Sequence, residues 1–244
     1  ADASHDRTKN RPVAAGTKAW QVGLGLTDAQ GNVRKDAQDK FRQINRMVEI
    51  FAPLIQALPD NPRIIDMGAG KGYLDFALAD WLQAQGRAAE IVGVELRPQL
   101  VEDGNRLAQS SGLASLSFAP GSILDYDAGG ADAVIALHAC DTATDDAIYK
   151  GITAGARLIA VAPCCHKQVR REMERGTAVG TLSPLLRHGI FRERQAEMLT
   201  DTLRALLLER HGYKTRVFEF VSDAHTPKNN LIVAEKDSRA GREV

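Results

Sequence analysis

A glycine-rich segment reads D-M-G-A-G-K-G-Y over residues 66–73, between a predicted strand and a predicted helix. Glycine lets the backbone approach a ligand closely, and a helix N-terminus offers free N–H groups. The glycines are Gly68, Gly70 and Gly72, whereas dinucleotide-binding proteins require the G-x-G-x-x-G spacing. The pattern is D-x-G-x-G-x-G instead, which indicates a ligand site of another kind.

This pattern is followed, 25 residues after Gly70, by Glu95 at the end of a second predicted strand. The combination resembles motifs I and II of the class I S-adenosylmethionine-dependent methyltransferases, and the resemblance covers residues 60–236. It implies S-adenosylmethionine as the cofactor, with the three glycines close to its methionine moiety. Asp66 would help to fix the amino-acid end, and Glu95 would accept hydrogen bonds from both ribose hydroxyls, since one carboxylate offers two oxygens.

The same resemblance places the adenine beside the end of the third predicted strand. Many relatives carry an acidic residue there, whereas this chain reads Gly121-Ser122-Ile123. Ser122 and Ile123 are therefore the expected adenine contacts.

Histidine and cysteine residues follow the fourth and fifth predicted strands, in the segments A-L-H-A-C-D-T-A-T-D (136–145) and A-P-C-C-H-K (162–167). In an open α/β sheet, ligands bind outside the carboxyl ends of the strands. The candidate catalytic residues are therefore His138, Cys164 and His166. His138 is the leading candidate because of its place at the cleft, and it is also expected to line the cofactor site.

Three chemistries remain open for this cluster. His138 or His166 could take a proton from a hydroxyl or nitrogen acceptor. Cys164 or Cys165 could attack C6 of a pyrimidine, which requires a stabilised thiolate. A zinc site could use the soft ligands of the cluster, but adjacent residues of an extended strand point to opposite faces. At most one of the paired cysteines should then face the pocket, so we predict no metal site, and each cysteine could equally be a packing residue.

The pair of motifs L-H-A-C-x-x-A-T-D and P-C-C resembles a subgroup of the class, the methyltransferase-like domain of glutathione S-transferase C-terminal domain-containing proteins. It is more distantly similar to the eukaryotic tRNA 2′-O-methyltransferases with a Cys-Cys-His-His signature. Those relatives have glycine where this chain has Asp141.

The elements that must position these residues alternate between β-rich runs and helices. An amphipathic helix is expected from Arg34 to about Leu58, and five strands separated by helices then predict a doubly wound, mainly parallel α/β sheet. Two later strands are joined by only a short turn, so they should be antiparallel and complete a seven-stranded, Rossmann-like sheet. The seven runs are 63–68, 90–96, 116–123, 131–140, 157–165, 213–221 and 230–236.

We expect an N-terminal loop and helical cap over residues 1–59 and a methyltransferase domain over 60–244, with a helical insertion at about 166–212. The turn between the last two strands, Thr226 to Asn230, should overlook the pocket and offers Lys228 and Asn229 as substrate contacts.

Charge is balanced over the whole chain, with 31 Lys+Arg and 31 Asp+Glu, which excludes a chain-wide polycation. The distribution is uneven, because residues 166–216 carry 11 basic and 6 acidic side chains whereas 51–165 carry 7 and 14. RNA is thus a candidate acceptor, and a protein or a small molecule is the alternative. A non-catalytic nucleoside-binding protein is the third hypothesis. The basic residues expected to contact RNA are Lys40, Arg42, Arg46, Lys167, Arg170, Arg171 and Arg175.

The three cysteines suggest no disulfide framework, and two of them are sequence neighbours, which is typical of a reducing compartment. No apolar stretch approaches the roughly 18 to 20 residues that cross a bilayer, and the first residues lack the apolar core of a signal peptide. We therefore expect a cytoplasmic protein without membrane contact, and leave its oligomeric state open.

Overall fold

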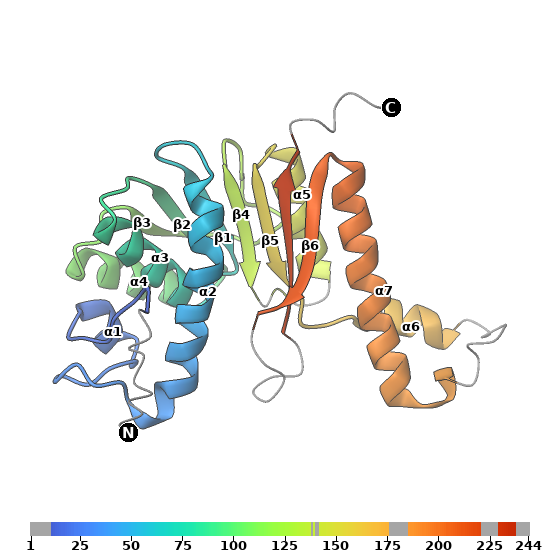
Figure 1. Cartoon of the computed structure of the whole chain (residues 1–244), viewed down its shortest axis with the longest axis horizontal. Coiled ribbons are helices and arrows are strands. Elements are labelled where there is room, and N and C mark those ends of the chain that lie inside the picture. Colours follow the sequence, from blue (N-terminus) through green and yellow to red (C-terminus); the bar gives the residue numbers. More distant parts are fainter. Residues whose placement is uncertain (1–10, 138, 140–141, 176–184, 221–228, 238–244) are drawn as a thin grey trace, which may run out of the picture.

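The computed structural model describes residues 11–137, 139, 142–175, 185–220 and 229–237. Seven strands form one sheet in the order β3-β2-β1-β4-β5-β7-β6 (Figure 1). Strands β1 to β5 are parallel, and β7 is antiparallel to both β5 and β6, which confirms the predicted fold class. The bounds are β1 Arg63–Met67, β2 Glu90–Glu95, β3 Leu116–Pro120, β4 Ala133–Leu137, β5 Leu158–Ala162, β6 Tyr213–Glu219 and β7 Asn230–Lys236.

Helices cover both faces of the sheet, and Figure 1 shows α2 in front of the strands and α5 behind them. One apolar cluster joins α1, α2, α3 and α4 to one face, and a second cluster joins α5 and α7 to the other. Two 3-10 turns, η1 and η2, and the helix α6 complete the described elements. The bounds are α1 Ala19–Gly23, η1 Lys35–Ala37, α2 Gln38–Gln56, α3 Tyr73–Ala84, α4 Pro98–Ser110, α5 Thr142–Thr153, α6 Lys167–Arg175, η2 Leu185–Arg187 and α7 Gly189–Arg210.

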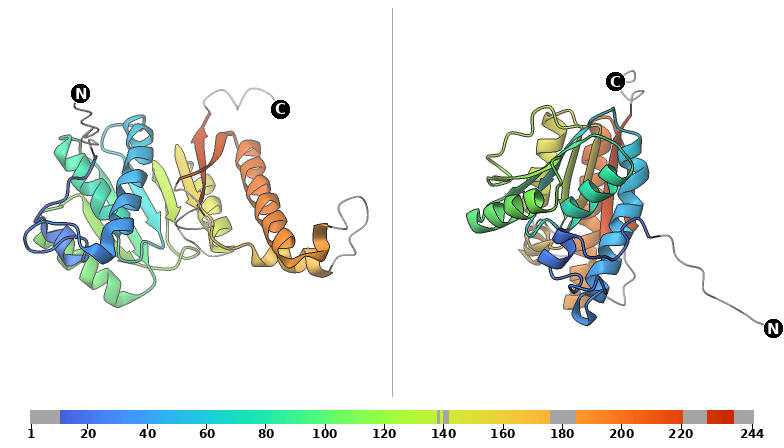
Figure 2. Two further views of the ribbon diagram at one scale, coloured as in Figure 1. Left: turned by 60° about the horizontal axis from the view of Figure 1, so that its bottom comes forward. Right: turned by 90° about the vertical axis from the view of Figure 1, so that its left-hand side faces the viewer.

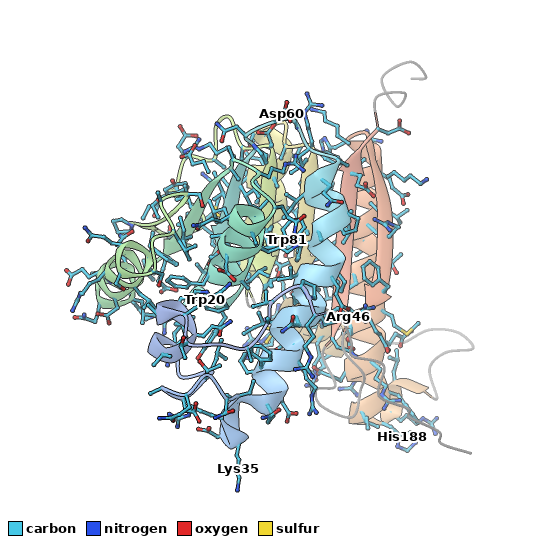
Figure 3. The ribbon with its side chains drawn as sticks, turned by 60° about the vertical axis from the view of Figure 1, so that its left-hand side comes forward. Trp20, Lys35, Arg46, Asp60, Trp81 and His188 are labelled. Atoms are coloured by element: carbon cyan, nitrogen blue, oxygen red, sulfur yellow. The ribbon has the colours of Figure 1, made fainter. Side chains whose placement is uncertain are left out.

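The N-terminal segment packs directly on the sheet's helical layer. The apolar stripe of α2 is buried as its three- and four-residue spacing predicts, with Phe41, Val48 and Phe51 nearly inaccessible. Trp20 stacks on Phe76 of α3, with ring centroids 6.2 Å apart. Figure 3 views the molecule from this side and labels Trp20, Trp81 on α3 and Arg46 on α2. The predicted cap therefore shares one hydrophobic core with the domain that it covers.

The segment after β5 is helical, as expected, but it packs unevenly. Helix α7 buries Ala196 and Leu208, whereas α6 has no buried residue. Helix α6 and the start of α7 extend beyond the sheet (Figure 2, left). Among the described residues, none of the helices combines the length and the apolar composition needed to span a bilayer.

Candidate active site

The glycine loop connects the end of β1 to α3 at the carboxyl edge of the sheet. Gly68, Gly70 and Gly72 all have positive φ, at 82°, 62° and 72°, a conformation that disfavours residues with a Cβ. A Cβ built on Gly68 would meet no atom within 4 Å, and one on Gly70 would meet only the Arg97 guanidinium, at 3.9 Å. Space for a ligand therefore lies directly against the backbone at these two positions.

The third glycine of the loop has a packing role. A Cβ on Gly72 would overlap the ring of Phe118, which comes from β3 and also fills the space beside Gly93 and Gly104. A side chain at residue 72 is therefore excluded by the core itself. Contact between Gly72 and the cofactor stays a prediction.

Glu95 ends β2 facing the loop, and it is only 5% exposed. Its Oε2 accepts the Gly70 N–H at 2.9 Å, and its Oε1 accepts the backbone N–H of Arg97 at 3.0 Å. The Arg97 guanidinium donates to both oxygens, at 2.8 and 3.2 Å, and this contact is the main reason that the pKa of Glu95 is lowered. The carboxylate is thus ionised and oriented at the loop, as an acceptor for a diol must be. Sequence reasoning missed Arg97, although its place two residues after the strand end was a usable signal.

A second acidic group lies behind the loop. Asp66 at the end of β1 and Asp75 in the first turn of α3 are 5% and 2% exposed, and each carboxyl group shifts the pKa of the other. Burial raises the pKa of Asp66 to about 7, and burial together with the charge of Asp66 raises the pKa of Asp75 well above its usual range. No spacing or motif in the sequence singles out Asp75.

A cavity of about 110 Å³ adjoins Asp66 and Gly68. Helix α2 closes its far side, and Tyr73 and Leu137 contribute to its walls. Lys40 of α2 lines it as well, with its ammonium 5.4 Å from the centre of the Tyr73 ring, and burial lowers the pKa of Lys40. The helix predicted as a cap therefore forms a wall of the candidate site.

The expected adenine contacts lie in a turn, because β3 ends at Pro120, before both residues. Ser122 donates from Oγ to Asp125 at 2.5 Å and accepts the Asp125 N–H at 3.2 Å. The hydroxyl thus closes its own turn. Ile123 and its neighbour Leu124, which is exposed, offer apolar surface on the same turn. The adenine contact of Ser122 and Ile123 stays a prediction.

His138, Cys140, Asp141 and Lys228 lie outside the described residues, so the leading catalytic candidate is not placed. The paired cysteines are placed, and the expectation that they point to opposite faces is wrong. Strand β5 ends at Ala162, so strand alternation does not extend to them, and their Sγ atoms lie 3.8 Å apart. The Sγ of Cys164 is also 4.0 Å from the Ala139 carbonyl oxygen, which brings the ends of β4 and β5 together.

His166 lies in a buried polar network beyond the end of β5, and is 3% exposed. Its Nδ1 is 3.9 Å from Oδ1 of Asp201 on α7. Arg204 donates to Asp201 at 3.2 Å and to Asp145 of α5 at 2.7 Å. The network therefore fixes the histidine between two helices that follow different strands, and its predicted role in proton transfer stays a prediction.

Ligand atoms of His166, Glu197 and Asp201 lie within 4.8 Å of one another, a spacing that a metal ion can bridge. Asn230, however, donates to the carboxylates of both Glu197 and Asp201 at 3.3 Å, and Arg204 donates to the second oxygen of Asp201. These donors already occupy three of the four carboxylate oxygens of Glu197 and Asp201. Asn229, predicted to overlook the pocket, is buried and lies just before β7.

Most of the basic residues expected to contact RNA have acidic neighbours. On α2, Arg42 pairs with Asp39, and Arg46, on the exposed side of the helix, pairs with Glu49 at 3.1 Å (Figure 3). The ion pairs of α6 join Arg170 to Glu174 and Glu193, at 3.3 and 2.6 Å, and Arg175 to Glu172 at 2.9 Å. Lys167 and Arg171 are exposed on the same helix.

Comparison with known proteins gives a family match and several similar structures. The family described as "Methyltransferase domain" matches residues 39–172. The glutathione S-transferase C-terminal domain-containing proteins of mouse and human are 26% and 25% identical over 91% of this chain. The chain covers only 37% of the length of each.

Solved structures share the fold at low identity. An rRNA methylase from Streptococcus thermophilus superposes with a TM-score of 0.52 at 12% identity, covering 79% of this chain and 97% of that one. A Podospora anserina methyltransferase bound to S-adenosylhomocysteine gives 0.52 at 14% identity, covering 91% and 87%. The sheet order and the family match agree with each other, and the chain belongs to the methyltransferase domain family, with the class I fold of S-adenosylmethionine-dependent enzymes.

Proposed function

We propose that the protein transfers a methyl group from S-adenosylmethionine to RNA. The main observation that supports this cofactor is the open space against the backbone at Gly68 and Gly70, beside the ionised carboxylate of Glu95. The cofactor is S-adenosylmethionine, which supplies an activated methyl group on a sulfonium. The chain holds its ribose through Glu95 and its amino-acid end through the backbone at Gly68 and through Asp66.

The choice of RNA as the acceptor is based on the positive charge of the segment that follows β5. Helix α6 has no buried residue and follows the end of β5 at the candidate site. Its basic residues are Lys167, Arg170, Arg171 and Arg175. Lys167 and Arg171 are exposed there, where cationic groups can meet phosphates. His138, which follows β4 in the sequence, is the proposed proton acceptor.

A protein or a small molecule is the alternative acceptor, and two observations favour it. The acidic neighbours of Arg42, Arg46, Arg170 and Arg175 reduce the positive charge available to a polyanion. A magnesium protoporphyrin IX methyltransferase from Synechocystis also shares the fold, with a TM-score of 0.50 at 18% identity over 90% of this chain and 93% of that one. A nucleoside-binding protein without catalysis remains the third hypothesis.

The test is methyl transfer from isotopically labelled cofactor into fractionated cell extract. Label in tRNA or rRNA supports the proposal. Label only in protein or in small molecules would contradict the choice of acceptor, and no label in any fraction would favour the non-catalytic hypothesis.

A matched pair of variants tests the contribution of α6. Lys167→Glu should weaken retention on heparin and reduce the salt dependence of RNA binding by about one phosphate contact. The control is Lys150→Glu, in the last turn of α5 and at the opposite edge of the sheet, which should change neither property. Equal effects of the two changes would indicate non-specific attraction.

A further inference from the structure

Two cysteines that are neighbours in the sequence lie with their side chains together in the loop between β5 and α6. The Sγ atoms of Cys164 and Cys165 are 3.8 Å apart, and both residues are partly exposed. The sulfur atoms of a disulfide are about 2.05 Å apart, so these two atoms would need to approach by less than about 2 Å to form one. A small reagent in the solvent can therefore reach the pair, and the two thiols are close enough to react with each other.

The adjacency of the two cysteines determines the kind of bond that they can form. Neighbouring Cα atoms are about 3.8 Å apart across a trans peptide, whereas those of disulfide-bonded cysteines are usually about 4.4–6.8 Å apart. A bond between Cys164 and Cys165 is therefore strained, and strain makes a disulfide easier to reduce. Such a bond does not suit a permanent structural link, and it suits reversible oxidation.

One of the two thiols also contacts the segment that follows β4. The Sγ of Cys164 lies 4.0 Å from the carbonyl oxygen of Ala139, to which a thiol can donate weakly. The same oxygen accepts a hydrogen bond from the Thr144 hydroxyl of α5 at 2.7 Å. Ala139 is the sequence neighbour of His138, the proposed proton acceptor. A disulfide has no S–H group, so oxidation would remove a donor that joins the ends of β4 and β5.

The residues on both sides of the pair are held in place. Pro163 is buried directly after β5, and His166 is buried 3.9 Å from the carboxylate of Asp201. The His166 carbonyl also accepts the N–H of Arg170, at 3.0 Å, where α6 begins. The distortion caused by a bond between the cysteines would therefore be confined to the loop and to its contact with Ala139.

We propose that Cys164 and Cys165 are a redox-active pair, which a low-molecular-weight disulfide such as oxidised glutathione converts reversibly into a disulfide at the edge of the candidate site. The exposed ammonium of Lys167, two residues after Cys165, favours an oxidant with negative charge, and glutathione carries such charge.

The reaction is two successive thiol–disulfide exchanges. One cysteine, as a thiolate, attacks a sulfur atom of the oxidant, the S–S bond of the oxidant breaks, and one glutathione leaves as a thiolate. The other cysteine then attacks the mixed disulfide at the protein sulfur and displaces the second glutathione. The cysteines lose two electrons and two protons. The oxidant gains both electrons, and its two thiolates take up the protons through the solvent.

Oxidation should slow methyl transfer while leaving the cofactor bound. This consequence rests on the proposed function, whereas the chemistry of the cysteine pair does not. The glycine loop and Glu95 follow β1 and β2, and β4 separates these strands from β5 in the sheet. The affinity for S-adenosylhomocysteine should therefore stay within twofold on oxidation, and the change should fall on the segment after β4.

The experiment equilibrates the full chain with mixtures of reduced and oxidised glutathione, stops the exchange with acid, blocks the remaining thiols and analyses peptides by mass spectrometry. We expect the peptide that contains Cys164 and Cys165 to lose two hydrogen atoms as the mixture becomes more oxidising, and to regain them with dithiothreitol. Cys165→Ser should instead carry one glutathione on Cys164. Phenylarsine oxide, which bridges two thiols that lie close together, should bind the native protein and neither Cys164→Ser nor Cys165→Ser.

The matched control is Cys140→Ser, which removes the third cysteine of the chain and should form the same bond as the native protein. A native protein that forms only mixed disulfides with glutathione, or a disulfide that includes Cys140, would overturn the inference and leave the proposed function intact.

Methyl transfer into the accepting fraction of the cell extract is then compared for the oxidised and the reduced protein. A fall on oxidation that dithiothreitol reverses supports the effect on the site, and equal transfer by the two forms would overturn that effect. Absence of transfer by both forms would instead count against the proposed function, while the disulfide would still be measured.

Discussion

Replacing Glu95 by glutamine is the sharpest single-residue test of the cofactor site. The change keeps the size of the side chain, but exchanges one acceptor oxygen for an amide donor and removes the charge. In the structure that carboxylate is ionised, nearly buried and oriented by the Gly70 N–H, so reorientation toward the ribose adds little cost. A hydrogen bond to a charged group contributes about 1.5–3 kcal/mol. Loss of one such bond to a ribose hydroxyl should weaken binding by about 10- to 150-fold.

The assay is calorimetric titration with S-adenosylhomocysteine at pH 7.5, with circular dichroism to check that the variant is folded. Arg97→Ala provides the contrast, because the guanidinium donates to both carboxylate oxygens that the ribose needs. Its removal should leave affinity equal to that of the native protein or raise it. A folded Glu95→Gln variant that binds within twofold of the native protein would refute the reasoning.

The other predictions concern stability. Gly72→Ala should lower the free energy of unfolding by about 3 kcal/mol, because the new methyl group overlaps Phe118 and the residue has a positive φ. The control is Gly86→Ala, which has a φ of 64° but open space around the new methyl group, and should cost only about 1–2 kcal/mol. Urea unfolding measures both losses, and equal losses would contradict the packing role of Gly72. Because the pKa of Asp66 in the folded protein is raised from 3.8 to about 7, stabilisation by its protonated form is complete below pH 3.8 and is lost as pH rises to about 7. The protein should thus lose up to about 1.4 kcal/mol of unfolding free energy per pH unit in this window, and an Asp66→Asn variant with an unchanged slope would contradict this. Arg204→Met should lower the free energy of unfolding by about 3–5 kcal/mol, because the buried carboxylate of Asp201 loses the guanidinium of Arg204. Thermal unfolding measures this loss, and a value below 1 kcal/mol would show that the network is unimportant to stability.

Most of the fold could be predicted from the sequence because its signals are local. The apolar spacing of α2 and the alternation of β-rich runs with helices are properties of neighbouring residues. The short stretch of sequence between β6 and β7 likewise predicts an antiparallel pair, which the structure has. The glycine loop and Glu95 could also be predicted, since the glycines have a recognisable spacing and Glu95 follows them at a fixed distance along the chain.

The features that the sequence could not show depend on where each strand ends and on which side chains from distant parts of the chain face one another. Strand β5 ends one residue before Pro163, which has no N–H to continue a ladder, so the rule of alternating faces failed for Cys164 and Cys165. Asp75 is one of several acidic residues on helices, and only the turn at the loop brings it to Asp66. The contact between His166 and Asp201 spans two elements far apart in the chain.

The most direct test of the central claim is the crystal structure of the complex with S-adenosylhomocysteine. We predict both ribose hydroxyls on the carboxylate of Glu95, with Arg97 displaced from at least one oxygen, and the methionine end against Gly68 and Asp66. A complex in which Arg97 still occupies both oxygens of Glu95, and the nucleoside lies elsewhere, would contradict the account.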